Sequence, residues 1–267
     1  MISVVTAFLD IGRHTWDNVF RRPIEAYFDS FPKMLPTLSR VVVFMDDRYL
    51  DRLPDDPKIT VIPINKTWLY EHSLAWKKER VAREIMESEG YRTRLRARIQ
   101  MGYPENVFPE YNTINHAKID FIHFAIQNRL VAEDDWVAWL DFGYYGSVLH
   151  NNPSEFPHSA LDVSKFVPDR VNCCLGQSIT PRHFDMDRVL LEAPDIFAGG
   201  FYIGPVPRMN DLYFLYHDRL DHMYAHEISD DDQHVLLRCF LARPDLFHLF
   251  VFPTWPQALL YFQKDIA

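Results

Sequence analysis

The stretch from Trp136 to Tyr144, WVAWLDFGY, decides the fold class. It opens with a near-continuous run of aromatic and aliphatic side chains, which is typical of a central strand covered on both faces. The run ends in a single acid, Asp141, followed by Phe142 and Gly143. A carboxylate is costly to bury without a partner, and ligands of α/β sheets bind at the carboxyl ends of strands. The stretch therefore predicts a buried strand that delivers Asp141 to a ligand, unless Asp141 only forms the turn at Phe142 and Gly143.

The predicted elements on either side of this strand alternate as they do in parallel α/β sheets. Further strands are predicted from composition at residues 2–9, 41–45, 59–64, 171–175, 197–204 and 247–252. Helices are predicted at residues 15–30 (ended by Pro32), 113–130, 206–227 and 229–242, with two more between 72 and 100 separated by Gly90. Prolines indicate a loop at 102–112 and an excursion from the sheet at 151–168. We expect residues 1–267 to form one Rossmann-like α/β domain, with a central mixed, mostly parallel sheet flanked by helices.

Size and charge limit the class of protein. The chain has 267 residues, 48% of them hydrophobic, which is enough to bury a sizeable core. Its formal net charge is −9 and its pI is about 5.7, whereas general nucleic-acid binders show net basicity or a basic face. Nucleic acid is therefore not an expected partner, although an acidic enzyme with a local basic pocket remains compatible with these values.

Cysteine usage and the N-terminal sequence predict a cytoplasmic protein. Cys173, Cys174 and Cys239 have neither metal-ligand spacing nor a disulfide framework, which fits a reducing compartment. The apolar N-terminal run lacks a positively charged start and is interrupted by Asp10, so it indicates a strand and not a signal peptide. No segment reaches the roughly 18 apolar residues of a membrane span.

One strongly basic stretch stands out in this acidic chain. Between residues 72 and 100 it carries Arg80, Arg83, Arg92, Arg94, Arg96 and Arg98. Such a stretch suits phosphates or peripheral contact with an acidic lipid surface, but a solvated helix face is the more frequent explanation.

The glycine-rich stretch at residues 197–204, FAGGFYIG, is the most unusual backbone signal. Glycine weakens a strand, so the pair Gly199 and Gly200 indicates a bulge or a close approach of the backbone to a ligand. A tight crossing within the sheet is the alternative.

Three consecutive acids, at positions 230–232, begin the helix predicted at 229–242. A capping box from Ser229 to Asp232, together with the helix dipole, explains them without any chemistry. However, Asp10, Asp141, the glycine pair and Asp231 with Asp232 all fall at strand ends or turns of one predicted sheet. Such junctions share an edge in α/β folds, which favours a common site.

The order of these motifs resembles nucleotide-sugar glycosyltransferases of the GT-A type. The carrying residues are Asp10-Ile-Gly12-Arg13, Asn115 with Lys118, Asp141-Phe-Gly143, the 198–204 strand and the DDQH sequence at 231–234. More narrowly, TAFLDIGR at 6–13 and WLDFGY at 139–144 resemble the bacterial HtrL/YibB-like family, which is found with cell-surface polysaccharide genes.

The resemblance implies roles for individual residues. The donor, a nucleotide sugar such as a UDP-sugar, is expected to contact Thr6, Ala7, Phe8, Asp10, Arg13, Asn115, Lys118, Asp141, Gly143, Gly199 and Gly200. Asp141 matches the first acid of the Asp-x-Asp motif, which holds Mn²⁺ or Mg²⁺ against the donor diphosphate. His248 resembles a late histidine of the metal shell, although a histidine beside Phe247 and Phe250 is more often a core residue. Asp231 and Asp232 match the catalytic acid pair near the acceptor.

Three functions follow from these expectations. The first is a glycosyltransferase that moves a sugar to a glycan or lipid-linked acceptor, in cell-surface polysaccharide biosynthesis. The second is an inactive nucleotide-binding or regulatory protein of the same fold, motivated by Gly143 in the place of the second acid. The third is a nucleotide-sugar hydrolase, which shares the donor site. Fold analogy alone does not choose among them.

Overall fold

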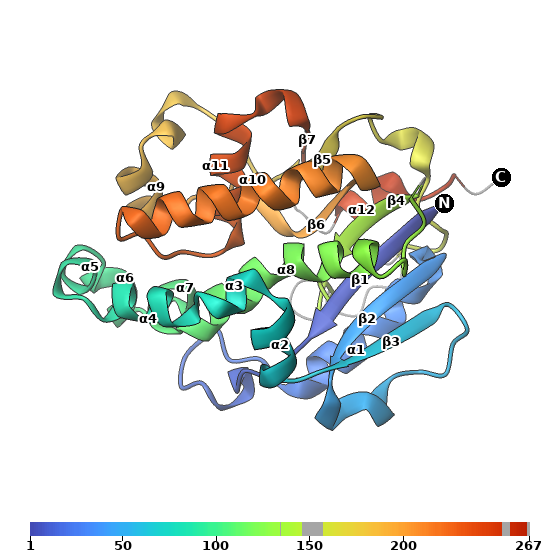
Figure 1. Ribbon diagram of the computed structural model, residues 1–267, viewed down its shortest axis with the longest axis horizontal. Helices are drawn as coiled ribbons and strands as arrows, with labels where there is room; N and C mark the ends of the chain where they lie inside the picture. Colours follow the sequence, from blue (N-terminus) through green and yellow to red (C-terminus); the bar gives the residue numbers. More distant parts are fainter. Residues whose placement is uncertain (134, 146–156, 253–256, 266–267) are drawn as a thin grey trace.

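Strand β4 (Trp136–Leu140) lies inside the sheet, between β1 (Ile2–Phe8) and β6 (Phe197–Pro205). The prediction of an internal strand is confirmed, because Val137 to Leu140 are all buried. The computed structural model describes residues 1–133, 135–145, 157–252 and 257–265. They form one α/β domain on a seven-stranded mixed, mostly parallel sheet, consistent with a Rossmann-like fold (Figure 1).

The order of the strands brings several chain segments to one edge. The order is β3-β2-β1-β4-β6-β5-β7, completed by β2 (Arg40–Asp46), β3 (Ile59–Ile64), β5 (Val171–Leu175) and β7 (Phe247–Val251). All neighbouring pairs are parallel except those of β6, which runs antiparallel to both β4 and β5. The carboxyl ends of β1 and β4 therefore meet the beginning of β6, where the Asp141 backbone N–H donates to the carbonyl of Gly200 over 2.9 Å.

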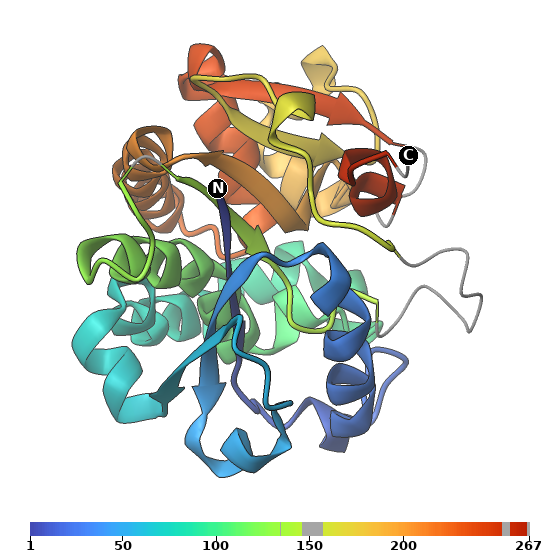
Figure 2. The same cartoon turned by 90° about the vertical axis from the view of Figure 1, so that its right-hand side faces the viewer.

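Helices cover both faces of the sheet because its strands are apolar on both sides. Along β1, Val4 and Val5 are both buried but belong to clusters on opposite faces. One face packs against α8 (Pro109–Gln127), α10 (Val206–Ala225) and α11 (Asp232–Ala242), and the other against α1 (Ile24–Met34) and α12 (Gln257–Phe262). In Figure 2, α10 lies to the left of the strands, and α1 and α12 lie to the right.

The remaining helices are short. The α-helices are α2 (Lys66–His72), α3 (Leu74–Lys77), α4 (Glu79–Glu87), α5 (Glu89–Arg94), α6 (Arg96–Gln100), α7 (Pro104–Val107) and α9 (Met186–Glu192). The 3₁₀ segments are η1 (Arg13–Thr15), η2 (Leu35–Thr37), η3 (Asp47–Arg52, kinked at Tyr49), η5 (Val163–Lys165), η6 (Pro181–Phe184) and η7 (Pro244–Leu246).

Two helix boundaries differ from the predictions because of capping residues. The two helices expected between residues 72 and 100 are four short ones, α3 to α6. The break expected at Gly90 falls at Ser88, whose side chain accepts a hydrogen bond from the Tyr91 backbone and caps α5. The loop expected at 102–112 is wrong, because Pro104 and Pro109 occupy the first positions of α7 and α8. Proline suits that position, since the N–H it lacks has no partner within the helix there.

The first helix also begins and ends later than predicted. Residue 15 ends a single 3₁₀ turn, and α1 begins only at Ile24, because Pro23 disfavours helical backbone in the residue before it. The helix then continues through Pro32, and its last turn buries Phe31 and Met34 against the sheet. Burial of these side chains offsets the backbone hydrogen bond that proline cannot donate.

Two other expectations concern the excursion at 151–168 and membrane spans. The part of the excursion before residue 157 lies outside the described residues, and the rest contains η5 and the buried Phe166. Among the described residues, no helix combines the length and the apolar character that crossing a bilayer requires.

Candidate functional site

A cavity of about 240 Å³ opens at the carboxyl ends of β1 and β4, and we call it the edge cavity. Its walls include the aromatic side chains of Phe8, Tyr27, Tyr111, Phe121, Trp139 and Tyr144. Its charged and amide side chains are Asp10, Arg13, His14, Arg22, Asn115, Lys118 and Asp141. An apolar pocket with a few polar groups is the usual form of a small-molecule site. The edge cavity is therefore the candidate functional site.

Lys118 ties together the elements around this cavity. Its Nζ donates to Asp232 Oδ2 over 2.8 Å and to the Gly199 carbonyl over 3.1 Å, and it lies 3.1 Å from Asp141 Oδ1. The three N–H groups of the ammonium thus face three acceptors. Lys118 is on α8, Asp232 begins α11, and Gly199 and Asp141 belong to β6 and to the end of β4. A single buried cation consequently fixes four segments that are distant in sequence.

The charge of this ammonium is stabilised by its neighbours. Burial by itself disfavours the charged lysine, but the attraction of Asp141 and Asp232 outweighs it and raises the Lys118 pKa above its ordinary value. The pKa of Asp232 is also raised, mainly because its side chain is only 6% exposed, and repulsion from Asp141 adds to this effect. Lys118 opposes that rise, so the three groups form one coupled buried network.

Asp141 is the carboxylate of this network that reaches the cavity. Its side chain is 40% exposed, compared with 8% for Lys118. The Trp139 indole donates to Oδ1 over 2.7 Å, and Lys118 approaches the same oxygen. Within the described part of the chain, Oδ2 has no hydrogen-bond partner. The following turn is closed by the Asp141 carbonyl, which accepts from the Tyr144 N–H over 3.0 Å. Turn formation therefore does not account for the Asp141 side chain.

The glycine pair in β6 permits two backbone approaches. A Cβ on Gly199 would lie 2.5 Å from Asp232 Oδ2, which is too close for any real contact. A Cβ on Gly200 would lie 3.3 Å from Asp141 Oδ2. The pair thus lets β6 pass between the two carboxylates that Lys118 joins. The bulge expected at these glycines is present, because the β5–β6 register shifts between Cys173, which pairs with Tyr202, and Leu175, which pairs with Phe197. The close approaches are to two carboxylate side chains.

We expect Gly199→Ala to destabilise the fold by about 1–3 kcal/mol, because the added methyl group must displace the Asp232 carboxylate from Lys118. Chemical denaturation measures the change. Gly90→Ala is the matched control: no atom lies within 4 Å of its added Cβ, and alanine favours the α5 helix. Equal stability of the two variants would show that the approach to Asp232 is not tight.

The acidic run at the start of α11 is divided between two environments. Asp231 is the N-cap, and its side chain accepts from the Gln233 N–H over 3.0 Å, so the expected box from Ser229 to Asp232 does not form. Ser229 instead accepts from the Asn112 amide. Asp231 faces a second, small cavity of about 50 Å³ beside Asp230, where burial and the charge of Asp230 hold its pKa well above the ordinary value.

Asp232 follows the cap and lies behind Lys118. Asp232 does not line the edge cavity. It contacts the site only indirectly, through its ion pair with the Lys118 ammonium. The expected acid pair is thus split, with Asp231 turned toward the second cavity and Asp232 toward Lys118.

The other residues expected at the donor site are arranged around β1. Ala7, Phe8, Asp10 and Arg13 line the edge cavity, whereas Thr6 is buried within the strand. The Asp10 carboxylate accepts from the Gly12 N–H at 2.8 Å and from the Tyr49 hydroxyl at 2.9 Å. Asp10 therefore holds the loop after β1 in addition to lining the cavity.

On the opposite wall, Asn115 and Lys118 both line the cavity, as their spacing of one helical turn predicts. Gly143 lines it as well, whereas Gly199 and Gly200 contact the carboxylates from behind.

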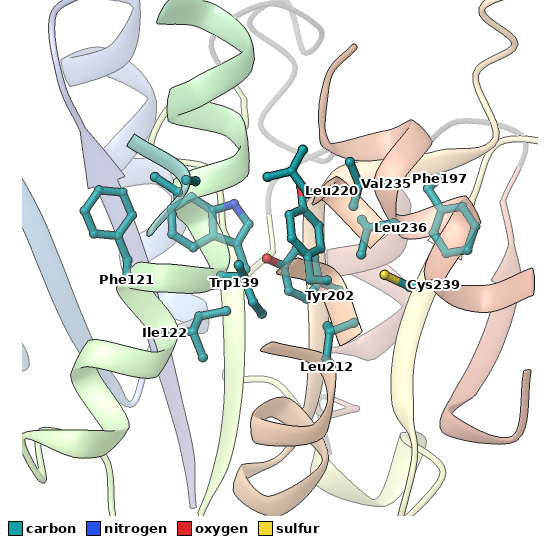
Figure 3. Close-up of a cluster of buried hydrophobic side chains, with 14 of the residues drawn as sticks. Phe121, Ile122, Trp139, Phe197, Tyr202, Leu212, Leu220, Val235, Leu236 and Cys239 are labelled. Carbon is teal, nitrogen blue, oxygen red and sulfur yellow. The ribbon is translucent and has the colours of Figure 1, made fainter. Parts of the chain in front are cut away.

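Many residues of the edge cavity were not anticipated from the sequence, and four of them bear on its chemistry. Trp139, Tyr27, Tyr111 and Arg22 line the cavity, and Trp139 also orients Asp141. Figure 3 shows Trp139 between Phe121 of α8 and Tyr202 of β6. The spacing of two residues between Trp139 and Asp141 places both side chains on one face of an extended chain, which is a usable signal. Tyr27, Tyr111 and Arg22 have no comparable local signal.

A divalent cation does not fit the described residues at Asp141. His248, the second expected ligand, lies on β7, which β6 and β5 separate from β4, and its ring packs 4.6 Å from that of Phe250. In the described ranges, no three His, Cys, Asp or Glu side chains are placed to hold a metal ion. Oδ1 of Asp141 is already engaged by Lys118 and Trp139, whereas Mg²⁺ or Mn²⁺ needs several oxygen ligands.

The basic stretch between residues 72 and 100 is largely ion-paired. Four of its arginines have carboxylate partners: Arg80, Arg83, Arg94 and Arg98. Such pairs on short surface helices favour a solvated face over a phosphate or lipid site.

Comparison with known proteins extends over almost the whole chain. The family model described as "Bacterial protein of unknown function (HtrL_YibB)" matches residues 1–264, and so includes every segment of the edge cavity. "Protein HtrL" of Escherichia coli (strain K12) is 27% identical over 258 residues, covering 92% of this chain and 86% of the relative. The chain therefore belongs to the HtrL_YibB family, whose function is unknown.

Proposed function

We propose that this protein is a glycosyltransferase that moves a sugar from a nucleotide-sugar donor to a glycan or lipid-linked acceptor. The observation that carries the proposal is the partly exposed Asp141 carboxylate, held by the buried Lys118 at the carboxyl ends of β1 and β4. An ion pair whose cation is buried is a costly arrangement for stability alone. Its position at the sheet edge is where α/β folds bind ligands.

The walls of the edge cavity suit the parts of a nucleotide sugar. Aromatic rings such as Tyr27 and Tyr111 offer flat apolar faces for a base or a sugar ring. The Asn115 amide nitrogen donates to the Tyr111 carbonyl over 2.9 Å, and its amide oxygen can accept from a hydroxyl. Arg13 supplies positive charge. The free Oδ2 of Asp141 can accept a hydrogen bond or a proton from a sugar hydroxyl.

Lys118 and Asp232 support this chemistry from behind. With Lys118 bound at Oδ1, Asp141 keeps a fixed orientation, and its negative charge is partly compensated before a phosphorylated donor arrives. Asp232 in turn holds the ammonium in place over 2.8 Å. We therefore propose that Asp232 contributes to the chemical step as a positioning residue, acting through Lys118.

The test is release of nucleoside diphosphate from a panel of nucleotide sugars, including UDP-sugars, with and without acceptors and manganese. We expect acceptor-dependent release, reduced about 10²-fold in Asp141→Asn because a positioned carboxylate is lost. Asp51→Asn, an exposed site on η3, is the control with the same chemical change.

The same assay separates the competing functions. Equal release without any acceptor identifies a hydrolase, and nucleotide binding without release identifies a regulatory protein. Full activity in a folded Asp141→Asn protein contradicts the proposed role of this carboxylate.

A further inference from the structure

Within the described chain, the uncompensated charges of the edge cavity are positive. Asp141 is paired with Lys118. Asp10 accepts two hydrogen bonds, lies 3.4 Å from His14 Nδ1, and lies 3.8 Å from Arg48, which it shares with Asp46. Arg13 and Arg22, in contrast, have no carboxylate within 4.0 Å among the described residues. The cavity is thus prepared for an anionic ligand.

The loop between β1 and α1 holds both guanidinium groups in place without using up their donors. Arg13 lies 5.5 Å from the centre of the Trp16 ring and 5.7 Å from that of Tyr111. Its Nε donates to the Phe20 carbonyl and its Nη1 to the Tyr27 hydroxyl over 3.4 Å. Arg22 lies 5.1 Å from the centre of the Tyr27 ring. Stacking orients a guanidinium and leaves most of its N–H groups free to bind an oxyanion.

Arg22 lies beside the position that distinguishes this chain from the Asp-x-Asp pattern. A Cβ on Gly143 would meet the Tyr27 ring at 2.6 Å and Nη1 of Arg22 at 3.2 Å. An acidic side chain therefore does not fit at position 143. The Arg22 guanidinium lies next to this position, which holds the second acid in the Asp-x-Asp pattern. Lys118, meanwhile, is already bound at the first acid.

We infer that the edge cavity binds the diphosphate group of its ligand directly through Arg13 and Arg22, with no divalent cation. This inference rests on the proposed function for the identity of the anion, a nucleoside diphosphate or its sugar ester. A guanidinium presents paired donors that match phosphate oxygens, and it supplies the positive charge that a metal ion supplies elsewhere. Lys118, whose donors are all engaged, contributes by neutralising Asp141 and not by binding the anion.

The test is calorimetric titration of the full-length protein with inorganic diphosphate and with UDP in EDTA, repeated with manganese. We expect both to bind in EDTA, with little change when manganese is added. Arg22→Gln should weaken binding roughly tenfold to a hundredfold, the range for a hydrogen bond to a charged group. Arg22→Lys keeps the charge and should recover part of the loss. Arg96→Gln, exposed on α6, is the control for a change of net charge.

Three results would overturn the inference: binding that requires manganese, unchanged affinity in a folded Arg22→Gln protein, or no binding of either anion. The outcome is separable from that of the proposed function. Diphosphate binding in EDTA without turnover of any nucleotide sugar supports the anion site and contradicts the proposed glycosyltransferase function. Turnover that depends on manganese supports the glycosyltransferase function and contradicts the inference that the diphosphate binds without a divalent cation.

Discussion

Lys118→Met is expected to lower the free energy of unfolding by about 3–5 kcal/mol at neutral pH, the usual cost of removing one partner from a buried ion pair. Methionine approximates the volume and flexibility of the lysine stem, so the main loss is the charge. Asp232 then keeps a negative charge with its side chain only 6% exposed, beside a second carboxylate on Asp141. Urea denaturation monitored by circular dichroism measures the difference.

The loss should depend on pH in a defined direction. Without the ammonium, the already raised pKa of Asp232 rises further, so the folded protein binds a proton more tightly than the unfolded chain does. Stability then increases as the pH falls from neutral toward the ordinary carboxyl pKa of 3.8. In the wild type, the raised Lys118 pKa contributes stability that persists up to its ordinary value of 10.5 and is lost above it.

A double variant provides the control for this interpretation. Lys118→Met combined with Asp232→Asn removes both buried charges, and it should be more stable at neutral pH than Lys118→Met alone. If the double variant is less stable than the single one, or if the single variant shows no gain on acidification, the buried charge of Asp232 is not the cause.

Asp232→Asn should lower the rate of sugar transfer by about 10²-fold or more in a protein that remains folded. Asparagine retains a hydrogen-bonding oxygen near Lys118 but removes the charge that holds the ammonium. Helix capping is preserved because the cap of α11 is Asp231, not Asp232. The measurement is kcat and its pH profile in the acceptor-dependent assay, together with a thermal unfolding curve.

The matched comparison for Asp232→Asn is Asp51→Asn, which makes the same chemical change at an exposed site on η3. A role in positioning Lys118 predicts that kcat falls and that its pH profile shifts. A purely structural role predicts lower stability with an unchanged kcat in the folded fraction. The second result would show that Asp232 stabilises the fold and has no role in the chemical step.

The sequence by itself was sufficient for the sheet and for one wall of the site. The run from Trp136 to Leu140 is apolar on both faces, and that property needs no knowledge of the neighbours to indicate an internal strand. Asn115 and Lys118 face the same cavity because residues three positions apart lie on the same face of a helix, which is a local property of the sequence. Family membership was likewise carried by short motifs at the strand ends.

Where local signals compete, the sequence was misleading. Prolines predict a helix end at Pro32 and a loop at 102–112, yet Pro32 lies inside a helix, and Pro104 and Pro109 begin helices. A proline excludes one backbone hydrogen bond, and whether that ends a helix depends on its position and on what the neighbouring residues bury.

Only the tertiary structure decided which charges meet. Lys118 and Asp232 are 114 positions apart, and they touch because β6 runs antiparallel beside β4 and has a glycine at the crossing. The same strand order places β6 and β5 between His248 and Asp141, although both had been assigned to one metal site. Residue periodicity encodes which side of an element is buried, whereas the pairing of distant side chains depends on strand order and direction, which no local pattern contains.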